Sequence, residues 1–331
     1  MFGTAISDNM SIARFDGEFW TNPEVVSSRS LSLHPGAHAL HYGSACFEGL
    51  KAHRGVDGRI RLFRPLDHAR RLKESAASML LPPPPVTLVT ELIDLAVAAN
   101  SEDVRVAPAS LYVRPTLLGT MVDIGAASRP SVEAVLYVLT SPVGDYFSGG
   151  LRPLTLLVET EVPRTVPHFG MVKAGANYAL ALRSTLEARK AVAADQVLFC
   201  PNGIVEETGA SNFFYFDGST VVTPSPTPAF LHGVTRDTVI CLARARGFTV
   251  DERHLPTAEL LARARRSRAE AWLSGTGAGL APVGTLVSGG QRVPVGTSEI
   301  GPTVTVLRQD LAAMQRGAAG DPYGWLRVVE A

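Results

Sequence analysis

Cysteine is scarce in this sequence, which excludes several kinds of cysteine-based site. Cys46, Cys200 and Cys241 are the only cysteines among 331 residues, and they lie far apart. This spacing fits neither a zinc-binding motif nor a framework of disulfide bonds. Isolated cysteines are usually small buried side chains in proteins of a reducing compartment. We therefore expect no metal site and a cytoplasmic location.

Net charge and long apolar runs are also lacking. The 31 basic Lys and Arg residues balance 31 acidic ones, so no broad field attracts nucleic acid or an anionic membrane. No apolar run approaches the ~20 residues of a membrane-spanning helix. Residues 1–9 lack the basic and then apolar pattern of a secretory signal. We expect a soluble protein that binds neither nucleic acid nor membrane.

Lysine is rare, and one lysine has unusual neighbours. The chain contains only Lys51, Lys73, Lys173 and Lys190, and Lys173 lies in an uncharged segment of small and apolar residues, 169–178. Burial disfavours the ammonium form and lowers the pKa of a lysine. A neutral amine can attack a carbonyl carbon and form a Schiff base. Taken alone, the pattern also suits a lysine that extends from an apolar segment to water.

The order of predicted elements indicates an α/β protein with two domains. In the first half, strand-like segments at 60–63, 109–118 and 132–140 accompany a helix-like segment at 65–79. Residues 141–150 are rich in Gly, Pro and Ser, which is typical of a linker. We expect a smaller N-terminal domain (1–140), an interdomain loop (141–151) and a larger C-terminal domain (152–331) that carries Lys173.

The second half continues the alternation of strands and helices. We expect strands at 154–159, 195–200 and 212–216, and helices at 177–191, 234–246 and 303–315. Thr257 is expected to cap one more helix.

Two glycine-bearing segments could bind an anion. Gly233 stands where a helix begins after a proline-rich approach, and the N–H groups and positive end of a helix suit a phosphate. An ordinary glycine-assisted helix start explains the same pattern. The second segment, 274–279, follows a predicted strand, and its backbone N–H groups could also face an anion.

The second segment also permits a test of a dinucleotide-binding alternative. That fingerprint requires Gly-x-Gly-x-x-Gly followed by a helix. Here the glycines are Gly275, Gly277 and Gly279, and Pro282 argues against a following helix. The pattern therefore disfavours an NAD-dependent dehydrogenase.

Glu206 and Glu207 lie between two predicted strand segments. In extended backbone, neighbouring side chains point to opposite faces, so one carboxylate can be buried while the other stays in water. A buried carboxylate could keep a pyridine nitrogen protonated, as pyridoxal phosphate (PLP) chemistry requires. A solvated acidic turn is the alternative.

Taken together, these residues resemble the PLP-dependent aminotransferases of fold type IV, and within them the branched-chain aminotransferases. The resemblance covers nearly the whole chain, and the joint occurrence of its motifs in this order is highly specific. The motifs are found at residues 40–51, 62–72, 111–115, 173–178, 207–212, 233–237 and 274–276. The resemblance implies two α/β domains with the active site in the cleft between them, and a homodimer in which residues cross the interface.

The resemblance assigns cofactor-binding roles to residues in both halves of the chain. Lys173 would bond to PLP and move the proton between Cα and C4′ of the reacting groups. Tyr178 would hydrogen-bond the phenolic oxygen, and Glu207 would pair with the pyridine nitrogen. The cofactor phosphate would be bound by Arg71, Val234, Thr235 and Thr276.

The resemblance also implies a substrate site. Thr276 and Gly277 would present N–H groups to the α-carboxylate of the amino acid. Tyr112 and Arg114 would line the side-chain pocket, where the arginine could accept the γ-carboxylate of glutamate. Three aromatic residues, Tyr42, Phe47 and Tyr146, would complete the site. Tyr42 would come from the partner subunit, and Tyr146 would lie in a loop that closes over the site.

The chain departs from the family pattern after Thr276. Gly277 and Gly279 stand where the family commonly has other small residues, and they remove side-chain bulk and loosen the turn beside the expected carboxylate site. The redox cysteine pair of the mammalian enzymes falls at Ala278 and Ala281. These departures concern the substrate rather than the transamination chemistry.

The leading expectation is therefore transamination between a branched-chain L-amino acid and 2-oxoglutarate. Within the fold, the alternatives are a biosynthetic aminotransferase for an unusual amino acid, a D-amino acid or (R)-amine transaminase, and an aminodeoxychorismate lyase. A non-catalytic protein of the same fold is a further alternative.

Overall fold

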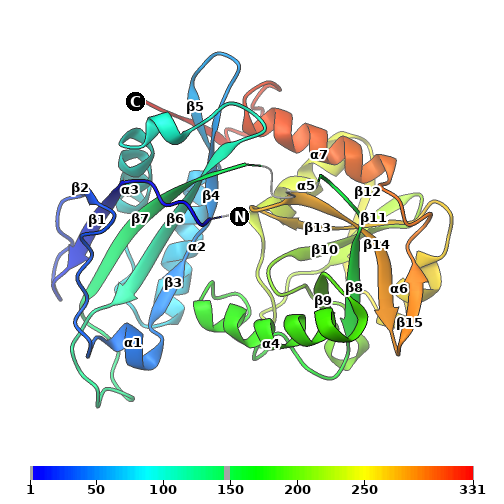
Figure 1. The fold of residues 1–331 in the computed structure, drawn as a ribbon, viewed down its shortest axis with the longest axis horizontal. Coiled ribbons are helices and arrows are strands. Elements are labelled where there is room, and N and C mark those ends of the chain that lie inside the picture. The colour runs from blue at the N-terminus through cyan, green and yellow to red at the C-terminus, as the bar shows by residue number, and fades with distance from the viewer. Residues whose placement is uncertain (1–2, 145–149, 331) are drawn as a thin grey trace. The chain divides into compact units, whose positions relative to one another are not determined.

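The structure is a computed structural model that describes residues 3–144 and 150–330. The chain forms two compact units, drawn in Figure 1. Unit 1 comprises Met1–Ser148, Val172–Gly175 and Ala313–Ala331, and unit 2 comprises Gly149–Met171 and Ala176–Ala312. Each unit has its own β-sheet and its own helices.

The sheet of unit 1 has the strand order β16-β5-β4-β6-β7-β1-β2, and the short strand β3 also pairs with β6. All of its strand pairs are antiparallel. The strands are β1 (Asn9–Phe15), β2 (Glu24–Ser27), β3 (Ala45–Phe47), β4 (Leu50–Arg54), β5 (Ile60–Phe63), β6 (Ser110–Gly119), β7 (Ala134–Val143) and β16 (Leu326–Val329). The helices are α1 (His38–Tyr42), α2 (Pro65–Ser78), α3 (Val86–Ala98) and the 3₁₀ turn η1 (Ser101–Asp103).

The central strand β6 shows why this sheet has two different faces. Its side chains alternate between buried and half-buried, as expected for a period of two. Leu111, Val113 and Leu117 belong to the apolar core that α2 and α3 cover. The alternate positions, which include Tyr112 and Arg114, therefore face away from these helices.

The sheet of unit 2 has the order β12-β11-β10-β13-β14-β8-β9, and β15 pairs with β14. Three of its pairs are parallel, namely β11 with β12, β14 with β8, and β8 with β9. The strands are β8 (Leu154–Glu159), β9 (Gln196–Phe199), β10 (Asn212–Phe216), β11 (Thr220–Pro224), β12 (Thr249–Arg253), β13 (Glu270–Gly275), β14 (Gly279–Ser288) and β15 (Gln291–Pro294). The helices are α4 (Gly175–Val192), η2 (Pro201–Gly203), α5 (Val234–Ala245), α6 (Thr257–Ala264) and α7 (Pro302–Gln315), which extends past the end of unit 2.

The middle of this second sheet is buried on both faces. Every residue of β10 is buried, and the Phe214 ring stacks on Trp272 of β13 with their centres 5.6 Å apart. An uninterrupted apolar strand of this kind is typical of a sheet covered on both sides. Such a strand is a rigid support for the polar residues at its ends.

The division into units differs from the expected boundaries. Residues 172–175, which include Lys173, group with unit 1 because Ala174 pairs with Cys46 beside β3. The C-terminal strand β16 also joins unit 1, since it pairs with β5. Strand β7 continues to Val143, so the expected loop 141–151 begins as a strand. The rest of that loop includes Tyr146, which lies outside the described residues.

One local expectation is wrong. Thr257 is the first helical residue of α6 rather than its cap, and the N-cap position is taken by Pro256. Proline fixes an extended backbone angle that suits entry into a helix, so a side-chain cap is not required here. The predicted stop of α5 is confirmed, because Gly247 has a left-handed φ of 81°.

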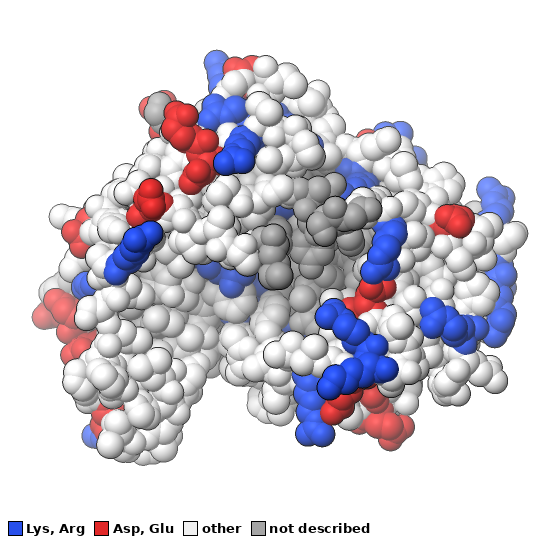
Figure 2. Space-filling model, viewed as in Figure 1, with Lys and Arg blue, Asp and Glu red and all other residues white. Residues whose placement is uncertain are grey.

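Charge is mixed over the surface. On the face drawn in Figure 2, Lys and Arg side chains are interspersed with Asp and Glu, in agreement with the balanced composition. Among the residues that the structure describes, no helix combines the length and apolar character needed to span a bilayer.

Candidate active site

In unit 1, Lys173 is held by its backbone on two sides. The Phe47 N–H donates to the Lys173 carbonyl at 3.0 Å, and the Lys173 N–H donates to Ser75 Oγ on α2 at 3.1 Å. The side chain is half-buried, and its Nζ lies 4.9 Å from the centre of the Phe47 ring. The segment is therefore fixed by β3 and α2, while the amine lies against an aromatic face.

Arg71 projects from α2 toward the same strand region. Its Nε donates to Glu48 Oε1 at 2.6 Å, and its Nη2 donates to Glu48 Oε2 at 2.9 Å. Only 13% of the Arg71 side chain is exposed, so its charge is largely removed from solvent. Paired hydrogen bonds of this type fix the plane of the guanidinium.

Glu48 and His68 complete a buried cluster that sequence reasoning missed. Glu48 is fully buried, and its Oε2 also lies 2.7 Å from His68 Nδ1. Burial by itself would raise the pKa of Glu48, yet Arg71 and then His68 hold that pKa well below its usual range. Burial lowers the pKa of His68. A glutamate set directly before Gly49 in an apolar run was the available signal.

Phe47, Tyr112 and Arg114 come together on the face of the sheet opposite α2 and α3. Arg114 Nη2 donates to the Tyr112 hydroxyl at 2.8 Å. Its guanidinium carbon lies 4.4 Å from the Phe47 ring centre and 5.1 Å from the Tyr112 ring centre. Arg114 Nε is buried and has no hydrogen-bond partner within the described residues. The Phe47 ring is thus shared by the Lys173 amine and the Arg114 guanidinium.

Close packing accounts for the glycine that follows Glu48. A Cβ added to Gly49 would lie 2.1 Å from the Tyr112 hydroxyl oxygen, which is far inside van der Waals contact. Any larger residue would displace Tyr112 and the arginine that it binds.

Tyr42 is not part of this group within the single chain. It ends α1, its hydroxyl donates to the Ile124 carbonyl at 2.5 Å, and 37% of the residue is exposed. Its ring packs on His38, with centres 4.9 Å apart. Within the described residues, these contacts place Tyr42 apart from Phe47 and Arg114.

In unit 2, the two adjacent glutamates face in opposite directions, as predicted. Glu207 is 2% exposed, whereas Glu206 is half-buried. Glu207 Oε1 lies 2.9 Å from Arg164 Nη1 and accepts the Leu231 N–H at 3.1 Å. Its Oε2 accepts from Asn212 Nδ2 at 3.1 Å. Glu207 is therefore an oriented carboxylate beside a guanidinium, which favours its charged form.

Arg164 links Glu207 to Tyr178, and sequence reasoning missed it. Its guanidinium carbon lies 5.4 Å from the Tyr178 ring centre, and its Nε donates to the Gly209 carbonyl at 3.2 Å. The Arg164 side chain is only 2% exposed. Arg164 lies in the Pro-rich stretch 163–167, where no helix or strand periodicity marks it as buried. A buried arginine needs an anionic partner, and here that partner is Glu207.

The start of α5 brings Val234 and Thr235 close to the Glu207 group. Asn212 Nδ2 also donates to the Leu231 carbonyl at 2.7 Å, and a Cβ added to Gly233 would lie 2.2 Å from Asn212 Oδ1. Within the described residues, no side-chain hydrogen bond caps this helix. The N-terminus thus has the character of an anion-binding helix end.

The segment 274–279 is the turn of a hairpin. Gly275 of β13 pairs with Gly279 of β14, so no helix follows the glycines and the dinucleotide alternative is excluded. Thr276 and Gly277 lie at the tip of this turn and are half-buried. Arg308 of α7 supports the turn, because its Nη1 donates to the carbonyls of Ala278 and Leu280 at 2.8 and 2.7 Å.

The donors in unit 2 suit a phosphorylated pyridine. Glu207 offers a fixed carboxylate, which matches a protonated ring nitrogen. The α5 N-terminus offers backbone N–H groups for a phosphate. The Ser274 hydroxyl is buried beside the turn and has no partner among the described residues. This combination of carboxylate, helix end and unpaired hydroxyl fits PLP.

Comparisons with known proteins agree with this chemistry. The family model described as amino-transferase class IV matches residues 45–286. A probable branched-chain-amino-acid aminotransferase of Streptomyces coelicolor is 34% identical over 99% of this chain and 92% of its own length. The branched-chain-amino-acid transaminase 1 of Bacillus subtilis is 34% identical over 98% of this chain and 92% of its own.

Solved structures show the same fold. The Escherichia coli branched-chain amino acid aminotransferase matches with a TM-score of 0.79 and 26% identity, covering 96% of this chain and 99% of that one. A second branched-chain amino acid aminotransferase, complexed with N-(5'-phosphopyridoxyl)-L-glutamate, matches with a TM-score of 0.78 and 25% identity, covering 97% of this chain and 98% of its own.

Proposed function

This chain belongs to the class IV aminotransferases, and we propose that it transfers the amino group of a branched-chain L-amino acid to a 2-oxo acid such as 2-oxoglutarate. It is a PLP-dependent enzyme of the fold type IV class. The observation that carries the proposal is the position of Lys173, which is fixed by hydrogen bonds to β3 and α2.

PLP, when bound, supplies a ring that accepts the electron pair left at the substrate Cα after proton removal. Glu207 would hold the proton on the ring nitrogen, because Arg164 keeps the carboxylate oriented and charged. Tyr178 would donate to the phenolic oxygen of the cofactor. Arg71, Val234, Thr235 and Thr276 would bind the phosphate.

Lys173 would hold the cofactor and take the proton from the substrate Cα. A general base must lie within hydrogen-bond reach of the proton it removes. The Lys173 backbone is fixed on both sides, while its four-carbon side chain can still move. The amine contacts the Phe47 ring, and the Arg114 guanidinium contacts the same ring.

Substrate recognition would divide between two groups. Thr276 and Gly277 would bind the α-carboxylate with N–H groups of the hairpin turn, which Arg308 supports from α7. Phe47, Tyr112 and Arg114 would contact the substrate side chain. The two rings suit an aliphatic side chain, and the guanidinium suits the second carboxylate of glutamate. The proposed use of glutamate is supported by the similar aminotransferase whose structure was solved with N-(5'-phosphopyridoxyl)-L-glutamate.

We further propose a homodimer in which Tyr42, and Tyr146 of the loop, contribute to the site. The support is a pair of exposed apolar side chains one turn apart on α4, since Leu182 is 56% and Leu186 is 45% exposed. Exposed apolar groups on one helix are typical of a protein interface. Sedimentation equilibrium of the wild type and of Leu182→Glu would test it, and a monomeric wild type would refute it.

A cytoplasmic location is proposed from the cysteines. Cys46 and Cys200 are buried, and within the described residues none of the three cysteines forms a disulfide. Burial raises the pKa of the Cys46 thiol to about 12, so this thiol resists oxidation.

The test of function is a panel of amino donors in the half-reaction. Purified enzyme loaded with PLP is mixed with one amino acid at a time, and loss of the cofactor's visible absorbance is followed. We expect fast loss with leucine, isoleucine, valine and glutamate. Loss with D-amino acids or (R)-amines alone would replace the branched-chain assignment while keeping the cofactor chemistry.

A further inference from the structure

Unit 2 contains a cavity that the proposed reaction does not use. It has a volume of about 270 Å³, and Glu206 is one of the residues that line it. Its walls are mostly apolar and include Pro163, Pro201, Pro224 and Phe230. Phe230 is 2% exposed, so this wall is part of the packed interior rather than a mobile surface.

Glu206 is the carboxylate in this cavity. Within the described residues its carboxylate has no hydrogen bond or ion pair, although the residue is half-buried. Burial, and then the charge of Glu207, raise the pKa of Glu206 to about 7, and Arg164 opposes the rise only partly. A partly buried carboxylate without a partner in the protein would gain free energy from a cation that donates a hydrogen bond to it.

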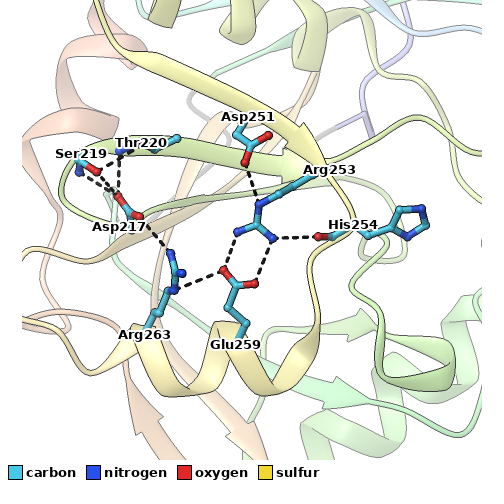
Figure 3. A network of polar contacts seen from close by, with 8 residues as sticks. All are labelled: Asp217, Ser219, Thr220, Asp251, Arg253, His254, Glu259 and Arg263. Carbon is cyan, nitrogen blue, oxygen red and sulfur yellow. Dashed lines mark hydrogen bonds and ion pairs between the residues drawn. The ribbon is translucent and has the colours of Figure 1, made fainter.

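The arginine at the cavity is already neutralised, as Figure 3 shows. Arg253 Nε donates to Asp251 at 2.8 Å, and its Nη2 donates to Glu259 at 2.5 Å. Its Nη1 donates to the backbone carbonyl of His254 at 2.9 Å. Arg164, which also acts on Glu206, is paired with Glu207. Neither guanidinium is therefore placed to neutralise Glu206.

His254 is the remaining titratable group of the cavity wall. Its imidazole points away from the Arg253 network in Figure 3. The charged groups that act on Glu206 are the Glu207 carboxylate and Arg164, and the buried thiol of Cys200 is a further neighbour. Arg253 and this imidazole share the cavity wall with Glu206.

We propose that this cavity binds a small organic cation, a protonated amine on a compact apolar body, whose N–H donates to Glu206 while the body packs on Phe230 and the prolines. A metal ion is a poor match, because divalent cations need several oxygen ligands and the wall offers one carboxylate. An anion in this cavity would be repelled by the Glu206 carboxylate. An aromatic face within ~6 Å adds attraction for an ammonium group.

The test uses the PLP-loaded enzyme and N-methylpiperidinium as the probe. This tertiary ammonium cannot bond to the cofactor aldehyde, so active-site chemistry does not complicate the result. Tetrahydropyran, a six-membered ring with oxygen in place of the charged nitrogen, is the uncharged control. Binding is measured by isothermal titration calorimetry at pH 8. We expect saturable binding of the cation and none of the ether.

Two matched variants locate the contact. Glu206→Gln keeps the shape of the side chain and should weaken binding about 10- to 100-fold, since a charged hydrogen bond is lost. Glu299→Gln removes the same charge from an exposed position outside the cavity and should leave the dissociation constant unchanged. Unchanged affinity in Glu206→Gln, equal losses in both variants, or equal binding of the ether would overturn the proposal.

The pH dependence adds an independent check. Only ionised Glu206 attracts the cation by charge and accepts a charge-assisted hydrogen bond, so affinity should be about tenfold weaker at pH 6 than at pH 8. The change of affinity with pH should therefore persist in His254→Asn and disappear in Glu206→Gln. If the pH dependence of affinity disappears in His254→Asn instead, the proposed contact between the cation and Glu206 is wrong.

Discussion

The Arg71 guanidinium and the Glu48 carboxylate form two hydrogen bonds in the interior of unit 1, at 2.6 and 2.9 Å. The pair joins helix α2 to the segment between β3 and β4, two elements that flank Lys173. Because Glu48 is fully buried, the pair orients the arginine that would bind the cofactor phosphate.

Glu48→Gln should therefore destabilise the protein and weaken PLP binding. Loss of one partner leaves a buried charge uncompensated, which costs about 3–5 kcal/mol. Urea unfolding of the apoprotein and fluorescence titration with PLP measure the two effects. The control is Glu187→Gln, which breaks an exposed pair with Arg183 and should leave the stability nearly unchanged. Equal costs for the two variants would show that the buried pair is not structural.

Lys173→Ala should abolish turnover and leave the fold intact. The amine is the proposed base at the substrate Cα, and removal of such a base costs about 10²- to 10⁴-fold or more. Its side chain is half-buried, so we expect little change in the melting temperature. Lys190→Ala, at an exposed position on α4, should keep full activity. Repeated turnovers by Lys173→Ala without added amine would refute the assignment.

The two adjacent glutamates should respond differently to the same change. Glu207→Gln removes the charge proposed to keep the ring nitrogen protonated, and it unpairs Arg164. We expect retained PLP and slow exchange of the Cα proton of leucine for deuterium, followed by NMR. Glu206→Gln should exchange at nearly the wild-type rate because its side chain faces the other way. The reverse ranking would mean that the catalytic carboxylate is Glu206.

Arg114→Ala tests the substrate side. If Arg114 binds the γ-carboxylate of glutamate, the variant loses a charged hydrogen bond of roughly 1.5–3 kcal/mol. The glutamate half-reaction should then lose roughly 10- to 100-fold in kcat/KM. Leucine should lose much less, since its side chain makes no such bond. Equal losses for both amino acids would indicate a structural role, through the ring contacts with Phe47 and Tyr112.

Glu206 should also make the stability of the protein fall as the pH rises, whereas most carboxylates in folded proteins have the opposite effect. Its pKa is about 7 when folded, above the ordinary 4.5, so the folded state holds the proton more tightly. The stability from this group is fully present below pH 4.5 and is lost as the pH rises through 7. Glu206→Gln should therefore gain melting temperature relative to wild type at pH 8 but not at pH 4.5. If the melting temperatures of the variant and the wild type differ by the same amount at pH 4.5 and pH 8, the pKa of Glu206 is not raised.

Local patterns predicted much of the fold. The helix predicted at 65–79 is α2, which begins at Pro65 and ends within one residue of the expected position. Strand β10 matches its predicted bounds. These features depend on neighbours in sequence, where proline, glycine and apolar periodicity act directly.

The partners of the site residues could not be predicted in this way. Glu48 and Arg71 are 23 positions apart, and Arg164 and Glu207 are 43 positions apart, so neither pair leaves a periodic trace. The arginine in 163–167 lies between prolines and has the composition of a loop. Only the packing of the sheet decides that it becomes buried beside a carboxylate.

The sequence by itself determined the family, the cofactor chemistry and the separation of Glu206 from Glu207, because motif identity and the two-residue period of extended backbone are properties of the chain. Tertiary structure alone decided which charges neutralise each other. It pairs Glu48 with Arg71, Glu207 with Arg164 and Arg253 with Glu259, and it leaves Glu206 facing a cavity. The physical reason is that burial makes an unpaired charge costly, and burial is set by the packing of distant segments.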